Sequence, residues 1–210
     1  MNIILNKSNL NAFEMQNQDY LVDITYYNLE AGQAEYRLYS YMSTLFDNVT
    51  ILDIGTNQGR SAVALSHNPT NHVISYDIQD YIRSKDYKLF TKPNMEFHVK
   101  NVMEDITPEF IESKNVQLVM IDICHTGPPE RKIMDKLWDS GFRGTVLLDD
   151  IWHPESRFRD GMQQMWNELP WQKYDISSIG HWSGTGLVFM NDTDSLQLVT
   201  DDSINVYLDK

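Results

Sequence analysis

Residues 52–61 have the sequence LDIGTNQGRS, and this stretch decides the fold prediction. It completes an apolar, β-branched run over residues 49–54 that is typical of a buried strand. Gly55 and Gly59 permit a tight turn and the close approach of another group to the backbone, and residues 61–65 indicate the start of a helix. A buried strand, a glycine-containing turn and a helix in this order predict the first unit of an α/β sheet.

Four more strands are predicted beyond this unit, and helices separate several of them. Apolar or β-branched runs cover residues 73–77, 95–99, 116–121 and 145–148. Helical periodicity marks residues 31–45, 128–138 and 158–169, where Met162, Met165 and Trp166 form a predicted core stripe. Because most of the strand runs do not alternate, we expect a parallel sheet that is covered on both faces.

The C-terminal part predicts an antiparallel hairpin at the edge of this sheet. Residues 174–179 and 186–190 flank a glycine-rich segment, GHWSGTG, with no helix between them. Short strands are also possible at residues 196–199 and 204–208. The predicted fold class is therefore doubly wound α/β with a terminal hairpin.

The composition fits one domain of 210 residues with a net charge of −13, from 17 basic and 30 acidic residues. We assign residues 30–210 to this domain and residues 1–29, which are polar and weakly periodic, to an arm or a cap. The negative charge disfavours nucleic acid and anionic membrane surfaces as partners, because phosphates attract clustered lysine and arginine. Cys124 is the only cysteine, which excludes an internal disulfide, and we expect it to be a buried structural thiol.

No secretory leader or run of about 20 apolar residues is recognisable, so a cytoplasmic location is expected.

The ends of the strands are where a ligand site is expected, because open α/β sheets bind ligands beyond the carboxyl ends of their strands. The glycine spacing does not fit a dinucleotide fingerprint, since Asn57 and Arg60 stand where its second and third glycines belong. NAD and FAD are therefore disfavoured. Asp77 ends the second strand, where an acidic side chain can accept both hydroxyls of a ribose. A plain strand-to-helix turn and a solvated aspartate remain the alternatives.

Taken together, these segments resemble class I S-adenosylmethionine-dependent methyltransferases. LDIGTNQGRS and SYDIQD are similar to motifs I and II of that family, and the resemblance runs through about residues 30–190. GQAE at residues 32–35, MIDICH at 120–125 and LLDDIWHP at 147–154 resemble segments of the metal-dependent, catechol-type and sugar O-methyltransferases. The resemblance implies a Rossmann-like, seven-stranded, mostly parallel sheet whose last strand is antiparallel.

The resemblance also implies a set of cofactor contacts. Motif I would surround the methionine part, Asp77 would bind the ribose, and Ile78 and Val102 would flank the adenine. The loop departs from the usual GxGxG form, and Asn101-Val102 replaces a common Asp-Ala pair. The predicted cofactor-binding residues are Asp53, Gly55, Thr56, Asn57, Gly59, Ser61, Asp77, Ile78, Val102 and Asp122.

Three carboxylates are expected to meet beyond the fourth and fifth strands. Asp122 and the pair Asp149-Asp150 follow strands that are neighbours in this topology. At an effective dielectric constant near 20, two such charges about 4 Å apart repel by about 4 kcal/mol, and a hard cation such as Mg²⁺ relieves that repulsion. Asp122, Asp149 and Asp150 are therefore the predicted metal ligands. The alternative is that Asp149 or Asp150 caps a helix beginning near Glu155.

Two histidines are candidates for the general base. His125 stands three residues after Asp122, where catechol-type enzymes carry a lysine base, and His153 stands three residues after Asp150. The predicted catalytic residues are His125, His153 and Asp122, and the sequence does not separate the two histidines. Trp152, His181 and Trp182 belong to loops at the same edge, where they would line a substrate pocket or pack in the core.

The function predicted on these grounds is metal-assisted methyl transfer from S-adenosylmethionine to a hydroxyl of a small molecule, such as a sugar or a vicinal diol. Two alternatives remain open: an aminopropyl transferase on the same fold, and a non-catalytic cofactor-binding subunit. The expected partners are a small hydroxylated substrate and a second copy of the chain in a homodimer.

Overall fold

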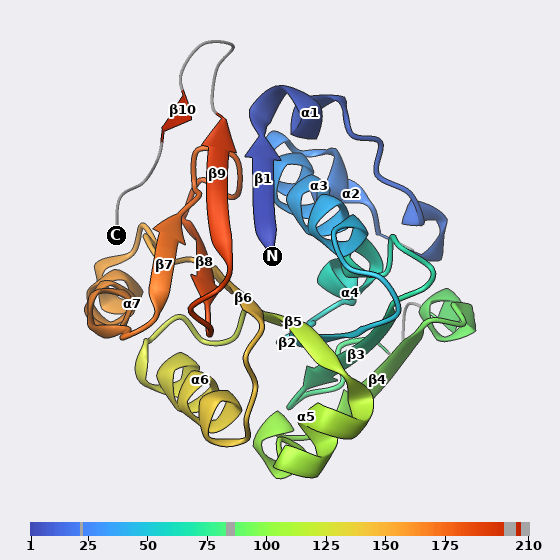
Figure 1. Cartoon of the computed structure of the whole chain (residues 1–210). Coiled ribbons are helices and arrows are strands. Elements are labelled where there is room, and N and C mark those ends of the chain that lie inside the picture. Colours follow the sequence, from blue (N-terminus) through green and yellow to red (C-terminus); the bar gives the residue numbers. More distant parts are fainter. Residues whose placement is uncertain (22, 83–86, 200–204, 207–210) are drawn as a thin grey trace.

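The computed structural model describes residues 1–21, 23–82, 87–199 and 205–206, and a seven-stranded sheet lies at its centre (Figure 1). The strand order is β4-β3-β2-β5-β6-β8-β7. Neighbours from β4 to β6 pair in parallel, whereas β8 is antiparallel to both β6 and β7. The strands are β2 (Thr50–Ile54), β3 (His72–Asp77), β4 (Met95–Val99), β5 (Val116–Ile121), β6 (Thr145–Asp149), β7 (Gln172–Asp175) and β8 (Thr185–Phe189). The predicted fold class and the terminal hairpin are confirmed.

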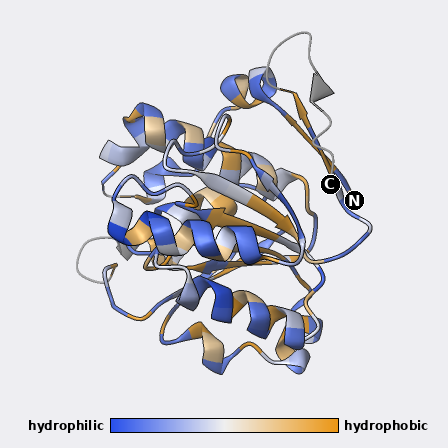
Figure 2. Ribbon diagram, turned by 90° about the vertical axis from the view of Figure 1, so that its left-hand side faces the viewer, coloured by the Kyte–Doolittle hydropathy of each residue, from blue (hydrophilic) through white to orange (hydrophobic). Residues whose placement is uncertain are grey.

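Two apolar clusters cover the two faces of this sheet. Alternate residues of each strand enter opposite clusters, as a pleated strand requires: Ile51 belongs to one and Leu52 to the other. Figure 2 shows the strands as an apolar layer between helices whose outer surfaces are polar. The helices are α3 (Glu30–Thr44) and α4 (Arg60–Leu65) on one face, and α5 (Pro108–Lys114), α6 (Pro128–Asp139) and α7 (Ser156–Glu168) on the other.

The predicted helices form where the periodicity places them. α3 buries Leu38 and Met42, and Pro128 and Pro129 occupy the first turn of α6. The predicted core stripe of α7 is confirmed, since Met162, Met165 and Trp166 are all buried.

The segment before α3 pairs with the C-terminal part of the chain. Strand β1 (Asn2–Asn6) runs parallel to β9 (Ser195–Val199), and β10 (Asn205–Val206) pairs with β9 on its other side. Helix α1 (Lys7–Ala12), the 3₁₀ turn η1 (Gln18–Tyr20) and α2 (Thr25–Asn28) then lead to α3. The possible strand at residues 196–199 corresponds to β9. Of the possible strand at 204–208, residues 204, 207 and 208 lie outside the described residues.

Short 3₁₀ turns complete the sheet connections, namely η2 (Tyr87–Thr91) and η3 (Val102–Glu104). Within the described ranges, no helix is both long enough and apolar enough to cross a membrane.

Candidate active site

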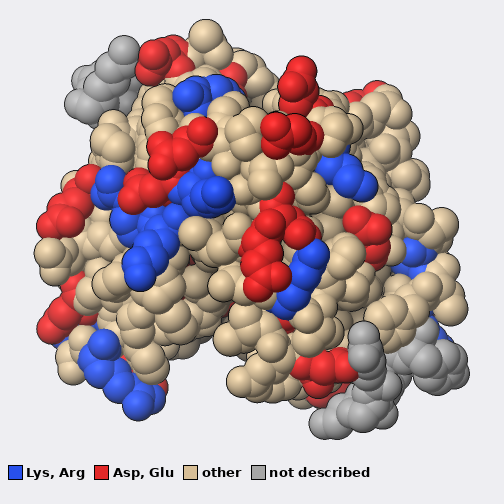
Figure 3. All heavy atoms as spheres, turned by 90° about the horizontal axis from the view of Figure 1, so that it is seen from below, with Lys and Arg blue, Asp and Glu red and all other residues tan. Residues whose placement is uncertain are grey.

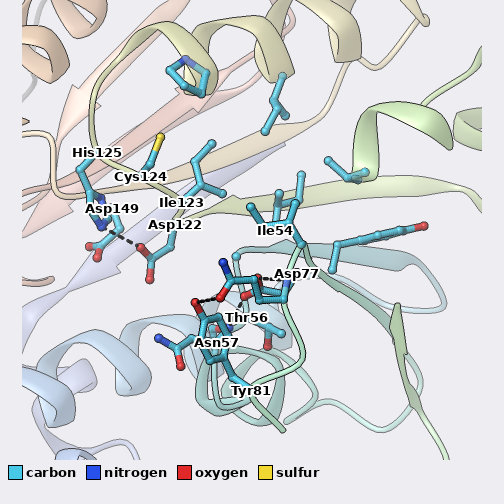
Figure 4. Close-up of a pocket in the computed structure, with 18 of the residues that line it drawn as sticks. Ile54, Thr56, Asn57, Asp77, Tyr81, Asp122, Ile123, Cys124, His125 and Asp149 are labelled. Carbon is cyan, nitrogen blue, oxygen red and sulfur yellow. Dashed lines mark hydrogen bonds and ion pairs between the residues drawn. The ribbon is translucent and has the colours of Figure 1, made fainter. Parts of the chain in front are cut away.

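A pocket opens beyond the carboxyl ends of β2, β3, β5 and β6 (Figure 4). Its volume is about 740 Å³, which lies within the range of about 300–1,000 Å³ for small-molecule sites. The segments that line it include residues 54–58, 76–79, 100–103 and 122–125, together with Tyr26, Glu35, Tyr36, Ser61, Tyr81, Asp149, Asp150 and His181. The topology therefore brings most of the predicted site residues to one cavity.

The turn after β2 is held against the end of β5. Gly55 and Gly59 both have positive φ angles, and the Gly55 amide donates to the Tyr76 carbonyl at 2.8 Å. A Cβ atom at Gly55 would lie 1.7 Å from the carbonyl oxygen of Asp122. Glycine is therefore required at position 55 both by its φ angle and by the close approach of the backbone that follows β5.

Asp77 closes this turn from the end of β3. Its Oδ2 accepts the amide of Asn57 at 2.9 Å, and its Oδ1 accepts the amide of Gln79 at 3.0 Å. A carboxylate has about four acceptor positions, so these two bonds leave capacity for the hydroxyls of a ligand. Asp77 is thus positioned by the loop and remains able to bind in the pocket.

The other predicted cofactor residues divide into two groups. Thr56, Asn57, Ser61, Ile78 and Val102 line the pocket, as do Gly55, Asp77 and Asp122. Asp53 and Gly59 do not. Asp53 is buried behind the turn, where it accepts a hydrogen bond from Ser75 Oγ at 2.7 Å and burial raises its pKa. Gly59 lies close to Leu89, which a Cβ at position 59 would meet at 2.7 Å.

Acidic side chains from three elements meet at the other end of the pocket. Glu35 of α3, Asp122 after β5 and Asp149 of β6 offer oxygen atoms that lie within 4.8 Å of one another. Asp149 belongs to a second group as well, with Asp150 and His181. Asp122 and Asp149 point toward the same space in Figure 4. The structure therefore places the three predicted metal ligands in two overlapping groups that share Asp149, and it adds Glu35 to one group and His181 to the other.

The pKa values of this acidic cluster reflect carboxyl groups that are buried close to one another. Burial, followed by the neighbouring Asp150 carboxylate, raises the pKa of Asp122 to about 8. Burial also raises the pKa of Glu35 and of Asp149 well above the usual range. Asp149 is only 6% exposed, and its Oδ1 accepts no hydrogen bond from any described residue. An unpartnered buried carboxylate oxygen is costly, and a bound cation would satisfy it.

The pKa of Asp150 shifts in the opposite direction to those of Asp122 and Asp149. Burial acts to raise its pKa, but hydrogen bonds from His181 and Ser183 outweigh that effect, so the pKa of Asp150 is lowered. Asp150 also has a positive φ of 57°. The helix-cap alternative for Asp149 and Asp150 is wrong, because α7 begins at Ser156 with Glu155 as its N-cap residue.

The structure separates the two candidate bases. His125 lines the pocket, with Nε2 3.5 Å from Asp122 Oδ1 and Nδ1 3.5 Å from Asp150 Oδ2. Burial lowers its pKa, so its imidazole is neutral near pH 7. His153 stacks on His125 with ring centres 5.6 Å apart, outside the pocket lining, and its Nδ1 accepts the amide of Glu155.

The aromatic side chains that line the pocket are mostly not the ones that the sequence suggested. Of the three loop residues, His181 lines the pocket, whereas Trp152 donates to Asp175 and Trp182 is 65% exposed. Tyrosines provide the wall instead: Tyr26, Tyr36, Tyr76 and Tyr81.

Cys124 is exposed and lines the pocket, so its prediction as a buried thiol is wrong. The reason lies in the loop after β5. The buried carboxylate of Glu130 accepts the amides of His125 at 2.7 Å and Gly127 at 2.8 Å, and these bonds fix the loop with Cys124 at the pocket surface.

Neither a family model nor a curated protein matches this chain. Several solved structures resemble it. The cofactor-bound protein Rv0187 from MTB has a TM-score of 0.61 at 14% identity, over 89% of this chain and 88% of that one. The O-methyltransferase TomG from Streptomyces achromogenes, in complex with SAM, has a TM-score of 0.56 at 16% identity, over 87% and 88% of the two chains.

An O-methyltransferase from Bacillus cereus in complex with SAH has a TM-score of 0.55 at 13% identity, over 77% of this chain and 81% of that one. At these identities the likeness shows a shared fold, the one in which these O-methyltransferases hold SAM or SAH.

Proposed function

We propose that the chain is an S-adenosylmethionine-dependent O-methyltransferase that uses a divalent cation and acts on a small hydroxylated molecule, such as a sugar or a vicinal diol. One observation carries the proposal. The same pocket contains two features. One is a strand-end turn suited to a nucleoside, and the other is an acidic cluster in which a buried carboxylate oxygen accepts no hydrogen bond from the described residues. Metal-assisted methyl transfer to a hydroxyl needs both halves within reach of each other.

The cofactor half of the pocket fits a nucleoside that carries no pyrophosphate. Asp77 retains acceptor capacity for ribose hydroxyls, and Ile78 and Val102 offer apolar surface beside it. Structures that share the fold hold SAM or SAH, which supports the same cofactor here. S-adenosylmethionine, when bound, supplies a methyl group on a positively charged sulfur.

The acidic half fits a divalent cation by its donor set. Asp149, which is grouped with Asp122 on one side and with Asp150 on the other, would hold it together with these two carboxylates. Asp149 Oδ1 accepts no hydrogen bond from the described residues. A cation held there would lower the pKa of a hydroxyl that binds it and would help to position that hydroxyl.

His125 is the residue suited to take the hydroxyl proton. It is neutral near pH 7, lies in the pocket and stands between Asp122 and Asp150. The negative charge of Asp150 stabilises the imidazolium that proton uptake creates. His153, behind it, would hold the His125 ring in place by stacking.

The acceptor is proposed to be small because the pocket must hold both cofactor and acceptor in about 740 Å³. A nucleic acid acceptor is disfavoured by the net charge of −13. Figure 3 shows one face of the molecule, on which basic and acidic side chains are interspersed without a continuous basic surface.

The test is a transfer assay with two arms. Purified protein is incubated with methyl-labelled S-adenosylmethionine, Mg²⁺ or Mn²⁺, and a panel of catechols and sugars. The parallel arm replaces the cofactor by its decarboxylated form and the acceptors by polyamines. Calorimetry with S-adenosylhomocysteine and with the cation alone is run on the wild type and on Asp150→Ala.

We expect labelled O-methyl product, cofactor binding in both proteins, and loss of cation binding in Asp150→Ala. An aminopropyl product would replace the proposal by the transferase alternative. Absence of S-adenosylhomocysteine binding would overturn it, and equal cation binding by the two proteins would remove its metal component.

A further inference from the structure

We infer that His181 is a ligand of the bound cation, so that Asp149, Asp150 and His181 form a mixed nitrogen–oxygen site that prefers a first-row transition metal to Mg²⁺. This inference rests on the proposed function for the role of the ion, whereas the donor atoms are seen in the structure. His181 lies in the hairpin turn before β8, and its side chain reaches the pocket beside the end of β6.

One ring nitrogen of His181 lies close to both carboxylates. His181 Nδ1 lies 3.7 Å from Asp149 Oδ1 and 3.6 Å from Asp150 Oδ1. Ligand atoms that share one ion at metal–ligand distances of about 2.1 Å lie about 3–3.5 Å apart, so only a small adjustment is needed. All three residues are at least nine-tenths buried. Of the two carboxylate oxygens near Nδ1, Asp149 Oδ1 is the one that accepts no hydrogen bond from the described residues.

The other ring nitrogen of His181, Nε2, contacts a tyrosine hydroxyl. His181 Nε2 lies 2.9 Å from the hydroxyl oxygen of Tyr26. A histidine that binds a metal through one nitrogen carries its proton on the other and donates it to a nearby acceptor, which fixes the tautomer and the ring orientation. Tyr26 supplies that acceptor from a helix remote in sequence.

The hydroxyl of Ser183 contacts both His181 Nδ1 and Asp150 Oδ1. A cation bound by Nδ1 would also satisfy Asp149 Oδ1, which lies 3.7 Å from Nδ1 and accepts no hydrogen bond from the described residues. The unsatisfied oxygen is therefore better explained by a metal site than by an ion pair.

The donor set determines the metal preference. Mg²⁺ binds oxygen ligands and retains its waters, whereas imidazole suits Fe²⁺, Co²⁺, Ni²⁺ and Zn²⁺, and affinities for a nitrogen-containing site rise from Mn²⁺ to Cu²⁺. A cluster of carboxylates alone would lack this discrimination. His181 would thus turn a magnesium-type cluster into one selective for transition metals.

The experiment measures binding, not turnover. Protein freed of metal with a chelator is titrated with Co²⁺ and with Mg²⁺ by calorimetry, for the wild type, His181→Gln, Tyr26→Phe and His72→Gln. His72 is partly exposed at the start of β3 and does not line the pocket, so His72→Gln is the matched control for the chemical change.

We expect the wild type and His72→Gln to bind Co²⁺ at least ~100-fold more tightly than Mg²⁺. His181→Gln should lose ~10–100-fold in Co²⁺ affinity and far less in Mg²⁺ affinity, and Tyr26→Phe should lose ~10-fold for Co²⁺. Proton NMR of the Co²⁺ protein should show a paramagnetically shifted, exchangeable imidazole N–H signal that disappears in His181→Gln.

Equal Co²⁺ affinity in the wild type and His181→Gln, or an unchanged shifted signal, would overturn the inference and leave His181 as an ion-pair partner. If His181→Gln does not fold, Tyr26→Phe and the wild-type NMR spectrum still decide. Binding of S-adenosylhomocysteine is measured in the same samples. Its loss in the wild type would contradict the proposed function, whereas the Co²⁺ results alone decide the role of His181.

Discussion

Asp77 makes two backbone contacts and has acceptor capacity to spare, so a conservative substitution is informative there. In Asp77→Asn, the amide keeps only one carboxyl-type oxygen and places an NH₂ group against a backbone donor. We expect the affinity for S-adenosylhomocysteine to fall by ~10–100-fold, the range for loss of one charged hydrogen bond. Calorimetry measures it, with Asp192→Asn, an exposed turn residue, as control. A dissociation constant within about twofold of the wild type would exclude Asp77 from the cofactor site.

His125 and His153 stack on each other, but their positions predict different kinetic roles. We expect His125→Asn to reduce kcat by ~10²–10⁴, because the group that takes the proton is lost, and His153→Asn to reduce it by less than ~10-fold. Burial lowers the pKa of His125, so its neutral form should persist below pH 6.5 and the acid limb of kcat/KM should lie below that pH. Steady-state kinetics across pH 5–9 test this, and the opposite ranking of the two variants would assign the base to His153.

Some residues of the site were predictable and others were not. The meeting of Asp122 with Asp149 follows from parallel strands whose carboxyl ends share one edge. Glu35 was missed, although a signal exists: it lies on the same helical stripe as Ala31, Leu38 and Met42, and a charged residue on an apolar stripe needs a buried partner. The contact between Tyr26 and His181 joins residues 155 positions apart, and no local pattern indicates it.

At the scale of elements, the turn between β2 and α4 should tolerate no side chain at Gly55. Gly55→Ala must place its Cβ 1.7 Å from the Asp122 carbonyl, whereas Gly141→Ala, also at positive φ, meets nothing within 4 Å. We expect Gly141→Ala to cost about 1–2 kcal/mol of unfolding free energy, from the left-handed conformation alone. Gly55→Ala should cost at least about 3 kcal/mol, because a backbone clash is added.

Urea denaturation followed by circular dichroism measures both costs. Equal destabilisation by the two substitutions would show that the turn after β2 relaxes away from β5 without penalty.

The elements themselves were largely predictable, because the period of the apolar residues changes between strands and helices. Residues 116–121 and 145–148 correspond to β5 and β6, and the hairpin follows from two strand patterns with no helix between them. The pairing of β1 with β9 was not predictable from pattern, since parallel pairing between distant segments has no local turn to mark it.

For the whole molecule, the acidic cluster predicts an unusual dependence of stability on pH. The pKa values of Glu35, Asp122 and Asp149 are raised in the folded state, so the folded protein binds more protons than the unfolded chain between about pH 4 and pH 8. Their contribution to stability is complete at the acidic end of this window and is lost as the pH rises. Asp105 and Asp150, whose pKa values are lowered, act in the opposite sense but only at more acidic pH.

We therefore expect the Tm of the metal-free protein to fall from pH 5.5 to pH 8, and a saturating divalent cation to raise Tm more at pH 8 than at pH 5.5. Differential scanning calorimetry tests both, with the double variant Asp122→Asn/Asp149→Asn as the control that should show a flatter profile. A metal-free Tm that rises across this interval would contradict the assignment of raised pKa values.

Strand β1 finds its partner only near the other end of the chain, since Asn2 pairs with Ser195, 193 positions later. On the ribosome, at about 5–20 residues per second, roughly 10–40 s separate the synthesis of these two residues. During that interval Ile3 and Leu5, which are fully buried in the finished protein, have no strand to pair with. The three-stranded sheet of β1, β9 and β10 therefore forms late in synthesis. Until it forms, the nascent chain exposes an apolar strand edge that chaperones can bind.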